Sequence, residues 1–198
     1  MENFHVSESF KVLLKENNNP FERLSRAQFR IIRRRMIDCI LATDMANHSK
    51  QMTEIKKLVD SKKIKNGENL ETILSDNEVK NMEMQQIILS ECVHTADLSN
   101  GAKLLDVFIT WTDLVYREFF NQGDVELRLE KSISMLCDRK TTNINKSQIG
   151  FIKFVVNPQF EMIVNILPEL HIYLSNLNNN LKYFENELEK ETKNEKVF

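Results

Sequence analysis

The stretch LSRAQFRIIRRRMIDCILATDMANHSKQM, residues 24–52, indicates the fold class of this chain. Ser25 and Gln28 stand at the spacing of a capping box, in which two side chains satisfy free backbone amides at the start of a helix. Apolar residues then recur on one helix face: Phe29, Ile32, Met36, Ile37, Ile40 and Leu41. We therefore predict a long amphipathic helix that ends near Ala46.

The rest of the chain has the same helical character. Its 198 residues are 41% hydrophobic and 28% charged, as in one globular domain with a sizeable core, and four glycines and three prolines leave few tight turns. Segments 81–98, 103–120 and 150–190 repeat the helical pattern. One apolar stripe is predicted in the second of these: Leu104, Phe108, Trp111, Val115 and Phe119. The sequence predicts an all-α multi-helix bundle, with Trp111 in its core.

Two segments are expected to differ from this pattern. Residues 60–80 are polar and contain one glycine, so we predict a surface connection there. The last residues, 191–198, are polar and terminal, and we expect them to fray. The globular part is therefore predicted to span residues 1–190.

Composition excludes several classes of partner and location. A formal net charge of -2 and one short basic cluster, residues 33–35, predict no nucleic-acid surface. The three cysteines have no CxxC spacing, which favours a reduced, cytoplasmic setting. No apolar run approaches the roughly 20 residues of a membrane span. Membrane attachment would need regions that this sequence lacks.

The stretch HTADLSNGAK, residues 94–103, contains the first candidate for chemistry. His94 and Asp97 are three residues apart, so a helix would place both on one face, as a divalent metal requires. Two ligands hold an ion only weakly, however. The spacing alone equally allows Asp97 to bond a helix end and His94 to be a hydrogen-bonded core histidine.

Several separated segments together resemble one family, the class I 3',5'-cyclic nucleotide phosphodiesterases. In chain order the matching segments are ENFH, ILATDMANHSKQM, HTADLSN, FFNQGDVE, SISMLCDR and KSQIGFIKFVVNPQFE. The resemblance implies an all-α catalytic domain of the HD-superfamily type with a two-metal site. It also implies hydrolysis of cyclic AMP, cyclic GMP or both to the 5'-monophosphate in signal transduction.

The resemblance assigns three residues to the metal side of this site. Asp97 matches an aspartate that ligates metal near both a zinc-type and a magnesium-type ion, as suits a hard carboxylate oxygen. Such a pair of ions would turn a bridging water into hydroxide and hold the phosphodiester oxygens. Glu2 and Thr43 match positions that hydrogen-bond metal-bound water and so orient it.

The resemblance assigns six residues to the cyclic nucleotide. Gln148 matches a glutamine whose amide pairs with the purine edge, and Phe151 matches the aromatic residue that stacks on the base. Val115 matches the apolar residue opposite Phe151, although core packing in the stripe would also explain it. Three further positions match residues near the base or on the pocket wall: Asn100, Thr112 and Leu136.

The chain also departs from the family pattern. Gly101 and Ala102 follow Asn100 where S-N-P-T-K is common, so we expect a less rigid turn after Asp97. Other departures from common family residues are Phe4 for histidine, Met135 for proline, Asn157 for histidine and Phe160 for tryptophan. None of these changes removes a direct metal ligand.

The family's H-N-x-x-H and H-D segments, which supply the catalytic acid and the other metal ligands, have no counterpart among these 198 residues. We therefore expect residues 1–190 to be the C-terminal portion of a catalytic domain, inactive alone and with apolar helix faces uncovered. The alternative is a non-catalytic nucleotide-binding or interaction module. The resemblance leaves a homodimer of the complete protein open, as it does the preference between the two purines, with Asn100 leaning toward cyclic AMP.

Overall fold

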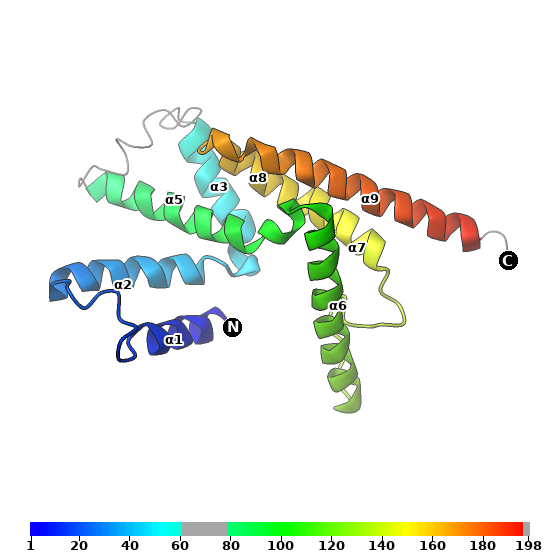
Figure 1. The fold of residues 1–198 in the computed structure, drawn as a ribbon, viewed down its shortest axis with the longest axis horizontal. Coiled ribbons are helices and arrows are strands. Elements are labelled where there is room, and N and C mark those ends of the chain that lie inside the picture. The colour runs from blue at the N-terminus through cyan, green and yellow to red at the C-terminus, as the bar shows by residue number, and fades with distance from the viewer. Residues whose placement is uncertain (61–78, 196–198) are drawn as a thin grey trace. The chain divides into compact units, whose positions relative to one another are not determined.

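The structure, a computed structural model, describes residues 1–60 and 79–195 (Figure 1). Every regular element within these residues is a helix, which confirms the all-α prediction. The α-helices are α1 (Glu2–Leu13), α2 (Arg26–Leu41), α3 (His48–Asp60), α5 (Val79–Asp97), α6 (Leu105–Arg128), α7 (Ile144–Phe151), α8 (Asn157–Val164) and α9 (His171–Glu195). The short elements are 3-10 turns η1 (Met45–Asn47), η2 (Ser99–Ala102) and η4 (Pro168–Leu170), and a π-helical segment, η3 (Ile152–Val156).

The chain divides into two compact units. Unit 1 consists of Met1–Asp97 with Met162–Pro168, and unit 2 of Leu98–Glu161 with Glu169–Phe198. Unit 1 therefore contains α1, α2, α3 and α5, and unit 2 contains η2, α6, α7, η3 and α9.

The first predicted helix of unit 1 is confirmed at its start and wrong at its end. The capping box forms, because the Ser25 hydroxyl accepts from the Gln28 amide while the Gln28 side chain accepts from the Ser25 amide. The helix ends at Leu41 and not near Ala46. The Asp44 carboxylate accepts a 2.9 Å hydrogen bond from the Ala46 N–H and so caps a new turn, η1, before α3 begins.

In unit 1, α5 packs against α2 and α3. Ile55 on α3 and Ile88 on α5 are buried and form part of the core. Arg35 on α2 donates a 2.7 Å hydrogen bond to Gln85 on α5. The third arginine of the basic cluster therefore joins two helices, whereas residues 33–34 are exposed.

In unit 2, α9 contacts α6, α7, η2 and η3. Figure 1 shows α9 running beside α7. The Phe108 and Phe184 rings meet edge to face with centroids 5.4 Å apart. Other buried apolar residues of this unit include Ile152, Val156 and Leu177. Since α9 contacts both η2 and α7, it supports the two segments that contain Asn100 and Gln148.

The predicted apolar stripe on α6 is only partly correct. Leu104 is 66% exposed and Trp111 is 51% exposed, so the prediction that Trp111 belongs to the core is wrong. The buried positions of α6 are Phe108, Thr112, Tyr116 and Gly123. Burial follows the i, i+4 row, which includes a threonine, and turns the tryptophan outward.

Both segments predicted to be irregular lie partly outside the described residues. α3 continues to Asp60 and α5 begins at Val79, and the connection between them, residues 61–78, is not described. At the other end, α9 is helical through Glu195 and residues 196–198 are not described, so the expected fraying of residues 191–198 stays a prediction. In the described parts of the chain, no helix combines the length and the apolar character that crossing a membrane requires.

Candidate functional site

Asp97, the predicted metal ligand, is the last residue of α5 in unit 1 and is exposed. The final carbonyl groups of a helix and the negative end of its dipole favour a cation at this place, so a carboxylate here suits a divalent ion. Among the described residues, however, no group of three or more histidine, cysteine or acidic side chains is placed to hold a metal. Asp97 fits one position in a metal site, and the described residues supply no full set of ligands.

His94 does not share the exposed position of Asp97, although it lies one helical turn earlier. It is fully buried, and its Nε2 lies 2.9 Å from Nδ1 of His48. Burial lowers the pKa of both imidazoles, and the neighbouring His48 lowers that of His94 further. His94 is therefore a core histidine that is bonded through Nε2, while its buried Nδ1 has no partner among the described residues. The plainer interpretation of the H-x-x-D spacing, a hydrogen-bonded core histidine, is thus met at one ring nitrogen.

Glu2 and Thr43, the other residues predicted on the metal side, also lie in unit 1. The Thr43 hydroxyl donates to the Ile40 carbonyl at 2.9 Å, which leaves its oxygen lone pairs able to accept from a water. Glu2 opens α1, and its carboxylate lies 3.1 Å from the N-terminal ammonium. A hydrogen bond from its own backbone N–H, and then that ammonium, lower the pKa of Glu2.

The predicted nucleotide residues all lie in unit 2, beginning with Asn100 in η2. The Gly101 N–H donates a 2.7 Å hydrogen bond to the Asn100 side-chain oxygen, Oδ1. The side chain of Asn100 is half-buried. Its amide is therefore held by the backbone of the next residue.

Two asparagines of α9 anchor the same turn. The Asn180 side chain is 1% exposed, and its Nδ2 donates to the Gly101 carbonyl at 2.8 Å and to the Lys103 carbonyl at 2.9 Å. Asn176, one helical turn earlier, donates to the Ala102 carbonyl at 3.0 Å. These bonds tie the carbonyls that follow Asn100 to α9, and the expectation of a less rigid turn stays a prediction.

Sequence reasoning missed both asparagines. The only feature of the sequence that pointed to them was that two asparagines stand four residues apart, the spacing that places residues on one face of a helix.

Gln148 and Phe151 lie one helical turn apart on α7. The Asn143 side chain caps this helix by accepting from the Lys146 N–H at 2.7 Å. Gln148 is only 8% exposed, yet its side-chain amide makes no hydrogen bond to any residue that the structure describes. Phe151 is half-buried. An amide whose donor and acceptor are both free can pair with a planar polar edge.

The backbone changes its winding directly after Phe151. Residues 152–156 form a π-helical segment, and Pro158 follows. Proline has no N–H to donate and disrupts the i→i−4 ladder, which explains a wider turn at this place. The glutamine and the phenylalanine are thus on the regular α-helical side of this change.

Thr112 and Val115 lie on α6. Thr112 is 6% exposed, and its buried hydroxyl has no hydrogen-bond partner within the described residues. Val115 is half-buried, whereas Phe108 on the same helix is completely buried. Core packing therefore explains Phe108 fully and Val115 only in part.

Leu136 lies in the loop between α6 and α7, in a left-handed backbone conformation with φ 66°. The end of α6 holds this loop tightly. The Ser134 N–H and hydroxyl each donate to the Glu126 carboxylate at 2.7 Å, and the Arg139 guanidinium pairs with both carboxylate oxygens of Asp124. The Arg139 hydrogen bonds lower the pKa of Asp124.

A glycine allows this close approach of loop and helix. A Cβ atom added to Gly123 would lie 2.0 Å from the Cys137 carbonyl oxygen, far inside van der Waals contact. Gly123 belongs to the FFNQGDVE segment. Packing therefore explains why a glycine stands in that segment: its lack of a side chain lets the loop that contains Leu136 lie against α6.

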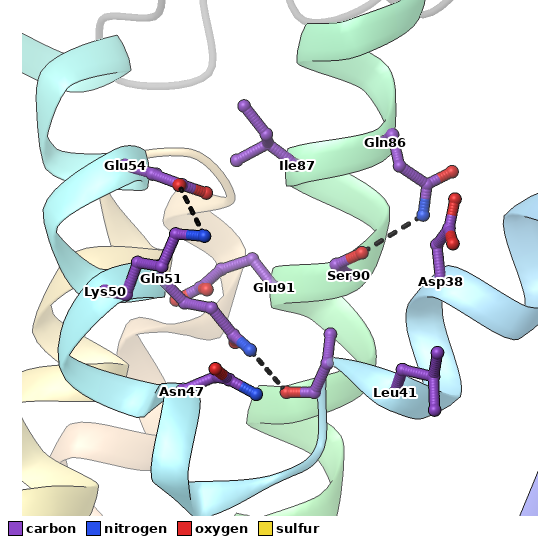
Figure 2. A pocket seen from close by; sticks show the side chains of 11 residues that line it. Asp38, Leu41, Asn47, Lys50, Gln51, Glu54, Gln86, Ile87, Ser90 and Glu91 are labelled. Carbon is purple, nitrogen blue, oxygen red and sulfur yellow. Dashed lines mark hydrogen bonds and ion pairs between the residues drawn. The ribbon is translucent and has the colours of Figure 1, made fainter. Parts of the chain in front are cut away.

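Unit 1 also contains a polar pocket of about 340 Å³ between α2, α3 and α5 (Figure 2). The Gln51 side chain donates to the Ala42 carbonyl at 2.7 Å. Figure 2 shows Gln86 donating to Ser90. The lining residues are Asp38, Leu41, Ala42, Asn47, Lys50, Gln51, Glu54, Gln86, Ile87, Ser90 and Glu91. None of the predicted site residues lines this pocket.

Comparison with known protein families identifies the class to which this helical chain belongs. The family model for the 3',5'-cyclic nucleotide phosphodiesterases matches residues 1–177. The chain belongs to this family.

Individual relatives support the assignment. The 3',5'-cyclic-AMP phosphodiesterase 4C of Rattus norvegicus is 36% identical over 186 residues, which are 93% of this chain and 33% of that protein. The 3',5'-cyclic-AMP phosphodiesterase isoform F of Drosophila melanogaster is 33% identical over 93% of this chain and 27% of its own length. The chain thus spans a third or less of these relatives.

A solved structure agrees with the fold. The phosphodiesterase domain of the Salpingoeca rosetta rhodopsin phosphodiesterase superposes with a TM-score of 0.84 at 27% identity. The superposition covers 100% of this chain and 57% of that one.

Proposed function

We propose that this chain is the part of a cyclic nucleotide phosphodiesterase that binds the purine and supplies one metal ligand. The reaction is hydrolysis of a 3',5'-cyclic nucleotide to the 5'-monophosphate. The observation that carries the proposal is the Gln148 side chain: the residue is only 8% exposed, and its amide makes no hydrogen bond to the described residues, so its donor and acceptor are free. A free amide on an otherwise buried residue can donate to and accept from the edge of a planar ligand.

On the nucleotide side, Gln148 pairs with the purine edge, and Phe151 stacks on the base. Val115 covers the opposite face of the base, which its half-buried side chain allows. The unpaired hydroxyl of Thr112 supplies a further polar contact. Asn100 contacts the edge of the base, and Leu136 forms part of the wall.

On the metal side, Asp97 ligates a divalent ion, and Glu2 and Thr43 orient metal-bound water. A zinc-type and a magnesium-type ion, when bound, would supply the hydroxide and neutralise the charge of the phosphodiester. Thr43 suits its role because its proton is already donated to a carbonyl, so its oxygen accepts. We propose that turnover needs metal ligands in addition to Asp97, and that these 198 residues bind the nucleotide without hydrolysing it.

Isothermal titration calorimetry with cyclic AMP and cyclic GMP tests the nucleotide side. Gln148→Ala and Phe151→Ala should each weaken binding by about tenfold or more, as the loss of a bonded amide or a stacking ring predicts. Phe154→Ala is the matched control, because Phe154 is three residues further along and is 79% exposed. It should leave the affinity unchanged.

The outcomes separate the possible functions. The proposal is supported if the wild-type chain binds a cyclic nucleotide and Gln148→Ala and Phe151→Ala each weaken that binding by about tenfold or more. The absence of any nucleotide binding would contradict it and leave a helical interaction module. Chromatography that detects the 5'-monophosphate measures hydrolysis. Hydrolysis by the purified chain would refute the proposal that turnover needs further metal ligands.

A further inference from the structure

We propose that an exposed face of α2, rich in arginine, binds anionic lipid headgroups and so attaches the chain to a negatively charged membrane surface. This arginine face consists of Arg26, Arg30, Arg33 and Arg34, all of which are exposed. Their spacing, i, i+4, i+7 and i+8, places the four side chains on one side of the helix. The face belongs to unit 1 and is independent of the residues assigned to the nucleotide, which lie in unit 2.

The helices that pack against α2 leave the arginine face uncovered. Figure 1 shows α2 between α1 and α5. On the side of α5, it is Arg35 that makes the contact, by donating to Gln85. On the side of α1, Arg33 forms the edge of the face, with its guanidinium carbon 5.3 Å from the centre of the Phe10 ring. The exposed arginines between these two contacts are available to a partner.

Most of the charge on this face is not neutralised within the described parts of the chain. Arg34 is paired, because its Nε donates to the Asp38 carboxylate at 2.8 Å. Arg26, Arg30 and Arg33 make no ion pair and no side-chain hydrogen bond to the described residues. Three guanidinium groups on one helix face are therefore free to bind anions.

The arginines are also placed against the local electrostatic preferences of a helix. Arg30 has a like charge one turn away on each side, at Arg26 and at Arg34, and such pairs repel each other. The first turn of α2 contains no acidic side chain, so Arg26 stands at the positive end of the helix dipole. An anionic partner would relieve both repulsions. Positions where a sequence departs from such local preferences are often functional.

The size of the face favours a lipid surface over a protein partner. From Arg26 to Arg34 the helix rises about 12 Å, and it is about 10 Å wide. The resulting area of about 120 Å² is far below the roughly 800 Å² that each partner in a stable protein complex buries. Attraction to anionic headgroups needs no such area, because it acts over about 10 Å at 0.1 M salt. Guanidinium groups also bind phosphate oxygens through paired hydrogen bonds.

Attachment of this kind needs no membrane-spanning helix and no lipid anchor. The sequence led us to expect that membrane attachment would require regions outside these 198 residues. The arginine face changes that expectation, because each basic residue near an anionic surface strengthens binding by about fivefold. The formal net charge of -2 on the whole chain opposes attachment, so we expect it to be weak, reversible and sensitive to salt.

Co-sedimentation of the chain with lipid vesicles tests this inference. The chain should bind vesicles of phosphatidylcholine with about one third phosphatidylserine at about 0.1 M salt, and should not bind phosphatidylcholine alone. About 0.5 M salt should release it. Arg26→Gln with Arg30→Gln should weaken binding by about twentyfold to thirtyfold. The matched control, Arg117→Gln with Arg128→Gln, removes the same charge from exposed positions of α6 and should weaken binding far less.

Two further measurements separate the loss of charge from the loss of structure. Arg26→Lys with Arg30→Lys keeps the charge and should keep most of the binding. The urea midpoint of Arg26→Gln with Arg30→Gln should be no lower than that of the wild type, because the exchange removes a repulsion. Its affinity for cyclic nucleotides should also be unchanged, so the result does not depend on whether the proposed function holds.

Several outcomes would overturn the inference. One is a wild-type chain that does not bind the anionic vesicles, which would leave the arginines as a solvated surface. Another is an equal loss of binding in the two glutamine double variants, or a loss in the lysine variant. Binding of duplex DNA or polyglutamate without binding of vesicles would assign the face to a different polyanion.

Discussion

The side-chain nitrogen of Asn180 lies 2.8 Å from the carbonyl oxygen of Gly101, 79 residues earlier in the chain. The same nitrogen lies 2.9 Å from the carbonyl oxygen of Lys103. One buried amide thus donates to two backbone carbonyls, one within the 3-10 turn η2 and one directly after it. This bond positions Asn100 from a distant helix.

Replacing Asn180 should therefore destabilise unit 2 strongly. Asn180→Leu leaves two backbone carbonyls without their donor, at a cost of about 2–4 kcal/mol in the free energy of unfolding. Urea unfolding followed by circular dichroism measures this cost. Asn179→Leu is the control, because Asn179 is the exposed neighbour on the same helix. Equal effects of the two variants would show that the bonds from Asn180 contribute little.

Two glycines should respond oppositely to alanine. Gly123→Ala places a Cβ atom 2.0 Å from a backbone oxygen, so either the loop or α6 must move, at a cost of about 1–3 kcal/mol or more. Gly150 is also helical, but a Cβ atom there meets nothing within 4 Å. Gly150→Ala should stabilise the chain by about 0.5–1 kcal/mol. The urea midpoints of both variants test the pair, and a tolerated Gly123→Ala would contradict the close approach.

The pair of His48 and His94 predicts a dependence of stability on pH. Burial lowers both pKa values, so below the ordinary histidine pKa of about 6.5 the unfolded chain binds more protons than the folded chain. This contribution to stability is complete above pH 6.5 and decreases as the pH falls from there toward the lower folded values. The negative charge of Asp97 favours the His94 imidazolium and so raises its pKa, but burial and His48 lower that pKa by more.

Urea midpoints measured between pH 8 and pH 5 check this dependence. We expect them to be level above pH 6.5 and to fall below it. A double variant, His48→Asn with His94→Gln, should lose most of that slope. His5→Gln should keep it, because His5 is exposed on α1. An unchanged slope in the double variant would assign the pH dependence to other groups.

Trp111 provides a direct check on the orientation of α6. It is the only tryptophan in the chain and is 51% exposed. Acrylamide should therefore quench its fluorescence in the native chain nearly as efficiently as in urea. A blue-shifted emission that acrylamide quenches poorly would mean that the indole is buried, as the apolar stripe predicted.

The sequence by itself determined the helical class, the start of α2 and the family. These features rest on local patterns, because a capping box, a helical period and short ordered motifs are contained within neighbouring residues. The site residues followed from the motifs as expectations. Asp97 was correctly expected at or near the end of a helix, because the periodic pattern stops there.

Only the tertiary structure decided which polar groups are paired. His94 is buried and Asp97 exposed because His94 contacts His48 on another helix. Packing between distant segments also turns Trp111 outward and joins Asn180 to the turn after Asn100. No local pattern encodes such contacts, since periodicity shows that a face is apolar or polar but not which neighbour covers it.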